Sequence, residues 1–217
     1  MLRGAIRQIR VFYFISMKKN ISIAITGGIG SGKSLASDFF EQKGFPLIRA
    51  DILAKELMKT DPSIRKSIVK EFGNESFANG NLNIEYLSKK VFSNATNVKK
   101  INAIVHPVTI KKIKELTRSY FKNHNIVFVE SALVFEAAIR DEFDHVILIC
   151  ADENLRVNRV LTRDGVTEQK VKSIIANQLQ DEKKKKLADF IIENNGTVAD
   201  FESKCNFILT VIQSLVK

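Results

Sequence analysis

Five short apolar runs, separated by longer stretches with helical spacing, set the pattern of this 217-residue sequence. They cover 21–25, 46–50, 125–129, 145–150 and 189–193, and several are rich in β-branched residues. Apolar runs of this length are typical of strands buried on both faces, as in a parallel sheet covered by helices. The pattern therefore predicts an α/β fold with a five-stranded parallel sheet flanked by helices.

Residues at helical spacing predict the helices that connect these strands. The predicted helices are one containing Leu35, Ala36, Phe39 and Phe40, then 52–59, a segment opened by Asp61-Pro62, a short amphipathic segment from Leu82 to Phe92, 106–122, a basic segment ending at Arg163-Asp164-Gly165, one capped by Thr167, and 199–216. Pro62 suits the first turn of its helix, and His106-Pro107 stands at the start of 106–122. A lone histidine there is more often a structural group than a catalyst.

A glycine-rich loop lies between the first strand and the first helix and reads Gly27-Gly28-Ile29-Gly30-Ser31-Gly32-Lys33-Ser34. It fits the phosphate-binding pattern of glycine, any four residues, then Gly-Lys and Ser or Thr. Glycines let successive N–H groups face a polyphosphate, and the start of the helix adds its positive end. Lys33 would reach the β- and γ-phosphates, and the Ser34 hydroxyl would help to hold Mg²⁺. The predicted phosphate-binding residues are Gly28, Ile29, Gly30, Ser31, Gly32, Lys33, Ser34 and Leu35.

Acidic residues follow two of the predicted strands. Asp51 lies at a strand end, where ligands of parallel sheets gather, but it is equally well placed to cap the helix 52–59. Glu130 resembles the metal-organising carboxylate that follows an apolar strand in nucleotide kinases, although any strand-end acid fits that pattern. Glu136, expected in a helix six residues further on, is a competing surface or site acid.

Three arginines, Arg156, Arg159 and Arg163, recur at offsets of three and four and so share one helix face. That face could close over a triphosphate and neutralise its charge, or it could be an ordinary solvated cationic face. Gly165 separates this helix from the next, which suits a mobile lid formed by 152–187. The segment 60–122 is too long for a simple crossover and is predicted to form the acceptor side.

The net charge of +10 is concentrated locally, which argues against a nucleic-acid-binding surface. Residues 1–20 carry five basic residues and no acid, and Lys183 to Lys186 add four more, expected on a solvated helix face. No segment approaches the apolar length of a membrane helix. Cys150 and Cys205 lack metal-ligand spacing and are predicted to be buried thiols of a protein in a reducing compartment.

The predicted domains follow from these motifs. The nucleotide-binding core comprises 17–59, 123–151 and 188–217. Residues 1–16 are rich in arginine and lack acids, and Met17 is predicted to be the natural start. A mitochondrial-type presequence is the alternative for this extension.

In their order along the chain, these motifs resemble those of the dephospho-CoA kinase family. The shared residues are Thr26 to Ser34, Ala50-Asp51 with Ala54, His106-Pro107, Leu133 to Glu136, Arg159 with Arg163-Asp164 and Gln178, Ala188-Asp189, and Asn194-Asn195-Gly196. The resemblance implies a P-loop nucleotide kinase fold with a helical CoA-binding domain and a helical lid. It also implies ATP-dependent phosphorylation of the ribose 3′-hydroxyl of dephospho-CoA, the last step of coenzyme A synthesis, in a cytoplasmic enzyme.

The resemblance further implies roles for single residues. It assigns Asp51, Lys33 and Arg163 to catalysis, Arg159 and Arg163 to the lid, His106, Phe135 and Glu136 to the acceptor side, Asn195 and Gly196 to the adenine side, and Ser34 with Glu130 to Mg²⁺. Arg49 departs from the family pattern, which often has a second acid two residues before Asp51. The expected partners are the small molecules ATP and dephospho-CoA, without nucleic acid or membrane. The expected state is a monomer, with an oligomer as the alternative.

Two other functions stay open on the sequence. A nucleoside or nucleoside-monophosphate kinase on the same scaffold would differ only in its acceptor. A P-loop NTPase switch would bind nucleotide without phosphorylating a metabolite, although the sequence lacks the Asn-Lys-x-Asp segment of guanine-binding switches.

Overall fold

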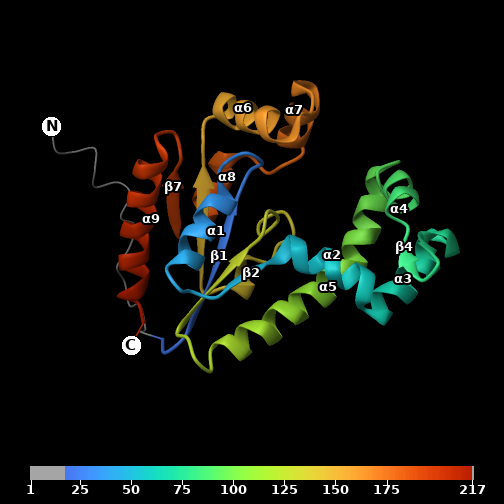
Figure 1. The fold of residues 1–217 in the computed structure, drawn as a ribbon, viewed down its shortest axis with the longest axis horizontal. Coiled ribbons are helices and arrows are strands. Elements are labelled where there is room, and N and C mark those ends of the chain that lie inside the picture. The colour runs from blue at the N-terminus through green and yellow to red at the C-terminus, as the bar shows by residue number, and fades with distance from the viewer. Residues whose placement is uncertain (1–17, 217) are drawn as a thin grey trace.

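A computed structural model describes residues 18–216 and has a central sheet with helices on both faces (Figure 1). Its five parallel strands are β1 (Ile21–Gly27), β2 (Leu47–Arg49), β5 (Ile126–Glu130), β6 (His145–Cys150) and β7 (Phe190–Glu193). The strand order is β2-β5-β1-β6-β7, so the strand that leads into the glycine loop lies at the centre. The predicted five-stranded parallel sheet is confirmed. The predictions for residues 1–16 and Met17 lie outside the described residues.

Alternate residues of the strands pack against different helices, which explains the continuous apolar runs. On one face, Ile23 and Ile25 of β1 lie in a core with α1 (Lys33–Gln42) and α9 (Val198–Gln213). The Phe40 ring of α1 stacks on Phe128 of β5 at 4.3 Å between ring centroids. On the other face, Ala24 packs with residues of the long helix α5 (Ala95–Tyr120), including Ile113. Both faces of the sheet are therefore buried.

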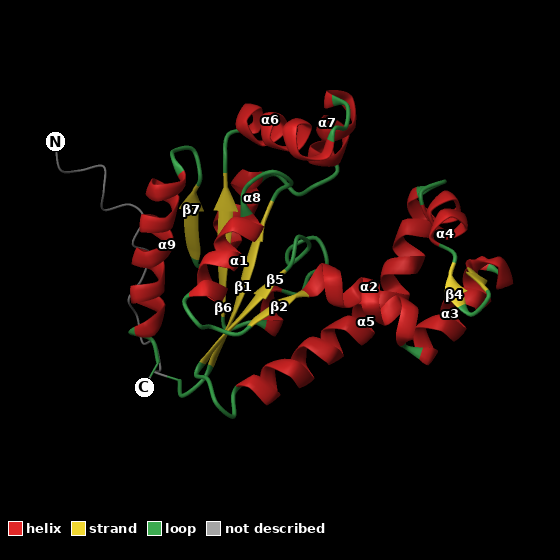
Figure 2. Ribbon diagram, viewed as in Figure 1, coloured by secondary structure: helices red, strands yellow, loops and turns green. Residues whose placement is uncertain are grey.

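A helical arm extends from the β2 edge of the sheet (Figure 2). It contains α2 (Ala50–Thr60), α3 (Pro62–Phe72), a 3₁₀ turn at Asn74–Ser76, the hairpin β3 (Phe77–Ala78) and β4 (Asn81–Leu82), α4 (Ile84–Val91) and α5. The arm has its own apolar core, in which Ile64 and Ile68 of α3 pack with Leu87 of α4 and Ile101 of α5. The arm is therefore packed by its own apolar cluster, separate from the two clusters on the faces of the sheet.

The start of α5 was predicted wrongly. The helix begins at Ala95 rather than at His106, and Pro107 lies inside it. The Asn94 side chain caps the helix by accepting a hydrogen bond from the Asn97 N–H at 2.8 Å. An internal proline removes one helical hydrogen bond and bends a helix without always ending it, and α5 changes direction along its length in Figure 2. Asn94, a residue type that favours N-caps, could have indicated the true start of α5, but Pro107 suggested a later start.

Two further short elements also differ from the predictions. Leu82 belongs to β4 instead of the amphipathic helix, because Asn79 and Gly80 adopt positive φ angles of 51° and 83° and turn the chain into a hairpin. Glu136 lies in a series of turns between β5 and the 3₁₀ turn Arg140–Glu142, not in a helix. The prediction of a helix at Glu136 was wrong, because the chain forms turns here and Ala138 adopts a positive φ of 53°, which a right-handed helix does not accommodate.

Three helices lie between β6 and β7: α6 (Glu153–Asp164), α7 (Glu168–Ala176) and α8 (Asp181–Leu187). Gly165, with φ of 61°, ends α6 as predicted, and the Thr167 side chain caps α7. The lysine run of α8 is not entirely a solvated face, because Lys184 is fully buried. In residues 18–216, none of the helices combines the length and the apolar character that crossing a bilayer requires.

Candidate active site

The glycine loop has the geometry that its sequence predicts. It joins β1 to α1, and Gly30 and Gly32 adopt φ angles of 75° and 102° that other residues rarely tolerate. A Cβ atom on Gly30 would lie only 2.5 Å from the Arg156 carbonyl oxygen, so that position also needs glycine for close packing. Lys33 begins α1 and donates from Nζ to the Gly28 carbonyl oxygen at 3.1 Å. Burial lowers the pKa of the Lys33 ammonium, although Glu130 and Asp51 oppose that shift.

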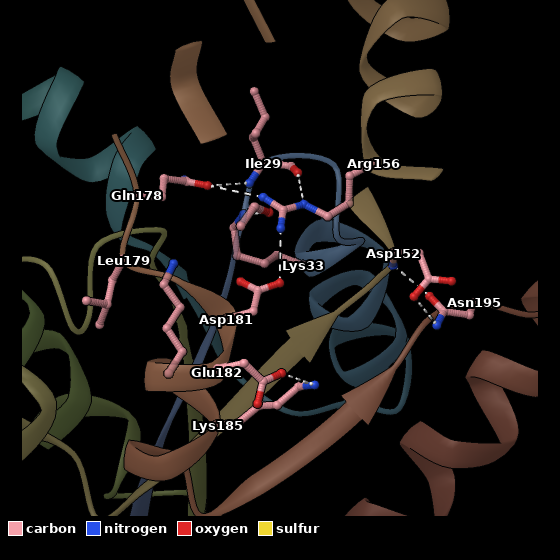
Figure 3. Close-up of polar contacts among 12 residues, drawn as sticks. Ile29, Lys33, Asp152, Arg156, Gln178, Leu179, Asp181, Glu182, Lys185 and Asn195 are labelled. Atoms are coloured by element: carbon pink, nitrogen blue, oxygen red, sulfur yellow. Dashed lines mark hydrogen bonds and ion pairs between the residues drawn. The ribbon is translucent and has the colours of Figure 1, made fainter. Parts of the chain in front are cut away.

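The tip of the loop is held from two sides by residues of the predicted lid (Figure 3). Arg156 donates from Nε to the Ile29 carbonyl oxygen at 2.9 Å, and Gln178 Oε1 accepts from the Ile29 N–H at 3.0 Å. Arg156 also forms an ion pair with Asp181 at 3.0 Å, and its side chain is only 6 % exposed. The alternative of a solvated cationic face is therefore wrong for Arg156, which is a buried support of the loop.

Ser34 and Glu130 meet beside the loop. The Ser34 hydroxyl donates to Glu130 Oε1 at 2.9 Å. The hydroxyl at the start of α1 and the carboxylate at the end of β5, the two groups predicted to hold Mg²⁺, are therefore in contact. Arg49 Nε lies 3.8 Å from Glu130 Oε2, and the same guanidinium pairs with Asp38 at 2.6 Å and Glu41 at 2.9 Å. The hydrogen bond from Arg49 to Glu41 is the main cause that raises the pKa of Arg49. Arg49 thus joins β2 to α1 at the position where the family often has an acid.

Asp51 does not cap a helix. The N-cap of α2 is Arg49, Asp51 lies within the first helical turn, and no side chain caps this end. Sequence reasoning placed the start of this helix at 52, whereas β2 passes directly into α2 at Ala50. The Asp51 side chain is exposed and available to a ligand.

Asp51 forms part of the wall of a cavity of about 320 Å³ between the sheet and the helical arm. This volume lies within the range of small-molecule sites. Its walls come from α2, α4, α5 and the segment after β5, and include Ala54, Met58, Leu87, Ile101, Val105, His106, Ser131 and Leu133. Burial lowers the pKa of His106 and so favours its uncharged form. The predicted residues Asp51 and His106, far apart in the sequence, therefore line one cavity.

The other predicted site residues lie elsewhere. Arg163 is exposed near the end of α6 and pairs with Asp164 at 2.6 Å, while Arg159 donates to the Asn194 carbonyl oxygen at 2.9 Å. Phe135 packs against the core beneath α5 and does not line the cavity described above. Glu136 Oε1 accepts from the Leu179 N–H at 3.2 Å.

The adenine-side candidates lie near the start of the predicted lid. The Asn195 side chain makes two hydrogen bonds of 2.9 Å with Asp152: its Oδ1 accepts from the Asp152 backbone N–H, and its amide donates to the Asp152 carboxylate (Figure 3). Gly196 lies beside Asp200 of α9. Asn194, which sequence reasoning left out of the site, donates from its amide to the Ser31 carbonyl oxygen at 2.9 Å and is buried. The Asn-Asn-Gly turn indicated that Asn194 could make a side-chain contact, but the sequence did not show that its partner is Ser31.

The family model for dephospho-CoA kinase matches residues 21–200. The chain belongs to the dephospho-CoA kinase family. A dephospho-CoA kinase of Bacteroides fragilis is 36 % identical over 179 residues, covering 81 % of this chain and 85 % of the relative. One from Fusobacterium nucleatum is 34 % identical over 183 residues, covering 84 % and 93 %.

A solved structure of the same family agrees with the fold. The dephospho-CoA kinase of Campylobacter jejuni superposes with a TM-score of 0.68 at 28 % identity, covering 88 % of this chain and 96 % of that one. The family resemblance and the P-loop kinase fold predicted from the sequence are therefore confirmed, and the protein is a kinase.

Proposed function

We propose that this kinase transfers the γ-phosphoryl group of ATP to the ribose 3′-hydroxyl of dephospho-CoA and releases CoA and ADP. One observation carries the proposal: Asp51 follows β2 at the sheet edge near the glycine loop and also belongs to the wall of the cavity. The carboxyl end of the neighbouring strand β5 carries Glu130, which accepts from Ser34 of the loop. A hydroxyl bound beside Asp51 would therefore approach a phosphate held by the loop.

The loop and Lys33 would bind the ATP phosphates. Backbone N–H groups from Gly28 to Leu35 would surround the polyphosphate, and Lys33 would leave the Gly28 carbonyl oxygen for the β- and γ-oxygens. Asn195 and Gly196, next to the start of the lid, are the proposed adenine side.

Ser34 and Glu130 fit Mg²⁺, because they present a hydroxyl and a carboxylate oxygen within 2.9 Å of each other and Mg²⁺ prefers oxygen ligands. Such an ion keeps most of its ligands as water and phosphate oxygens, so few protein groups are needed. When bound, it would neutralise charge on the β- and γ-phosphates. Arg49 would keep Glu130 oriented through its 3.8 Å ion pair.

The helical arm, residues 60–122 with α2, would hold dephospho-CoA in the cavity. Asp51 would orient the 3′-hydroxyl or accept its proton as the phosphoryl group arrives. His106, largely uncharged because of burial, would contribute a polar contact in an otherwise mostly apolar wall. Phe135 and Glu136 would support this acceptor side from behind the wall.

The lid, residues 152–187, would close over the phosphates. Arg163 would exchange Asp164 for the transferring phosphoryl group, with Arg159 beside it, and closure would exclude water that otherwise hydrolyses ATP. Most of the acceleration would come from positioning and charge neutralisation, because phosphoryl transfer requires little covalent chemistry from the protein. We further propose that the protein acts as a cytoplasmic monomer.

An acceptor panel tests this function. The purified protein is incubated with ATP and Mg²⁺ and with dephospho-CoA, AMP, adenosine or no acceptor, and ADP and phosphorylated products are quantified. We expect ADP and CoA in equal amounts with dephospho-CoA alone. Turnover with AMP or adenosine would indicate a nucleotide or nucleoside kinase, and equal ADP release without an acceptor would indicate an NTPase switch.

A further inference from the structure

Helix α8 buries one of its lysines completely. The Lys184 side chain is 0 % exposed, whereas the side chain of its neighbour Lys185 is 32 % exposed. Removing an ammonium from water is costly unless an anion compensates for it. Lys184 Nζ lies 2.8 Å from Glu136 Oε1, an ion pair whose angles are not those of a hydrogen bond. Glu136 is therefore the anion that makes this buried position tolerable.

The same carboxylate joins two parts of the molecule that face different substrates. Glu136 Oε1 also accepts from the N–H of Leu179, in the segment between α7 and α8. Glu136 itself belongs to the turns after β5, where Ser131, Leu133 and Ala137 line the acceptor cavity. A displacement of this cavity wall would therefore reach Leu179 through Glu136.

The segment from Gln178 to Asp181 also touches the phosphate loop (Figure 3). Gln178 Oε1 accepts from the Ile29 N–H at 3.0 Å, and that N–H is one of the donors that a bound phosphate would need. Asp181 pairs at 3.0 Å with Arg156, which holds the Ile29 carbonyl oxygen. A phosphate and Gln178 would thus compete for one donor, and the position of this segment affects how readily Gln178 yields.

We propose that Lys184 is a positioning residue that, through Glu136, couples occupancy of the acceptor cavity to the phosphate loop. A bound acceptor fixes the position of the turns after β5 and therefore of Glu136. Because Glu136 accepts from the Leu179 N–H, the segment that carries Gln178 shifts with it, and Gln178 withdraws from the Ile29 N–H. Each substrate then strengthens binding of the other, because coupling between two sites is reciprocal. This inference rests on the acceptor site proposed above.

Isothermal titration calorimetry tests the coupling. The affinity for adenylyl imidodiphosphate, a non-hydrolysable ATP analogue, is measured with Mg²⁺, without and with saturating dephospho-CoA. In the parent protein we expect dephospho-CoA to tighten the analogue by about fivefold or more, and in Lys184→Met and Glu136→Gln by less than about twofold. The double variant should lose no more than either single one, because both remove the same link.

Two features keep the result interpretable. Lys185→Met, which removes an exposed lysine paired with Glu182 on the same helix, should keep the full tightening. The double variant removes both charges of the buried pair, and the glutamine that replaces Glu136 retains an acceptor for the Leu179 N–H, so it serves if either single variant fails to fold. The coupling would be refuted if dephospho-CoA did not tighten the analogue in the parent, or if both variants kept the tightening seen in the parent. A lowered melting temperature in the variants would not change that conclusion. Failure of dephospho-CoA to bind the parent at all would instead refute the proposed function.

Discussion

Arg156 offers the sharpest test of how helix α6, part of the proposed lid, supports the glycine loop. Its guanidinium donates to the Ile29 carbonyl oxygen at 2.9 Å and pairs with Asp181 at 3.0 Å, with a side chain 6 % exposed. Arg156→Met would keep most of the apolar stem and remove both contacts. It would leave the Ile29 oxygen unpaired, and also the Asp181 carboxylate, which is 26 % exposed and therefore partly hydrated.

The expected loss of stability follows from these contacts. Because one partner is partly hydrated, we expect a loss of about 3 kcal/mol in the free energy of unfolding, at the lower end for a broken buried ion pair. For a chain of this size that corresponds to a fall of about 6–12 °C in melting temperature. Because the loop tip also loses its support, we expect KM for ATP to rise by about tenfold at saturating dephospho-CoA.

Thermal unfolding and steady-state kinetics measure the two effects separately. Arg163→Met is the control for stability, because Arg163 lies on the same helix but is 64 % exposed, and its melting temperature should change little. An unchanged melting temperature in Arg156→Met would refute the energetic argument. A lowered melting temperature with an unchanged KM for ATP would show that Arg156 stabilises the lid without positioning the loop.

Lys33→Ala and Arg163→Ala should each lower turnover by about two orders of magnitude or more while the protein stays folded, and near-normal turnover would remove that residue from the mechanism. Burial lowers the pKa of His106 below its ordinary 6.5, so below that pH the unfolded chain binds a proton that the folded protein does not. The free energy of unfolding should therefore fall as pH drops below 6.5, less so in His106→Asn, and equal losses in both proteins would contradict this. Burial raises the pKa of Cys150 to about 11 and of Cys205 to about 12, so a thiol reagent at about pH 8 should label them only after denaturation. Rapid labelling of the native protein would show that one of them is accessible.

The sheet and the loop could be predicted from the sequence because their signals are local. The strand before Gly27, the glycines and the apolar helix positions all lie within one short segment. The order of the strands, by contrast, depends on pairing between distant segments such as β1 with β5. Asp51 and His106 could be named as candidates, but only the fold shows that they line one cavity.

The errors arose where a local signal competed with tertiary packing. Pro107 is a common helix breaker, yet α5 continues through it because Ile101, Val105 and Ile113 bury one side of the helix on both parts of the molecule. Lys184 looked solvated within its lysine run, since its partner Glu136 lies in a distant turn. The support that Arg156 gives to the loop was missed for the same reason, because its partner Ile29 is far away in sequence.

The most direct test of the central claim, that Asp51 acts where the phosphate loop and the acceptor cavity meet, is the turnover of Asp51→Asn with dephospho-CoA. We expect turnover to fall by about a hundredfold or more, with ATP affinity within about twofold of the parent. Asp61→Asn is the matched control, because Asp61 caps α3 and asparagine caps equally well. Unchanged turnover in Asp51→Asn would contradict the account and show that Asp51 is a surface carboxylate without a role in catalysis.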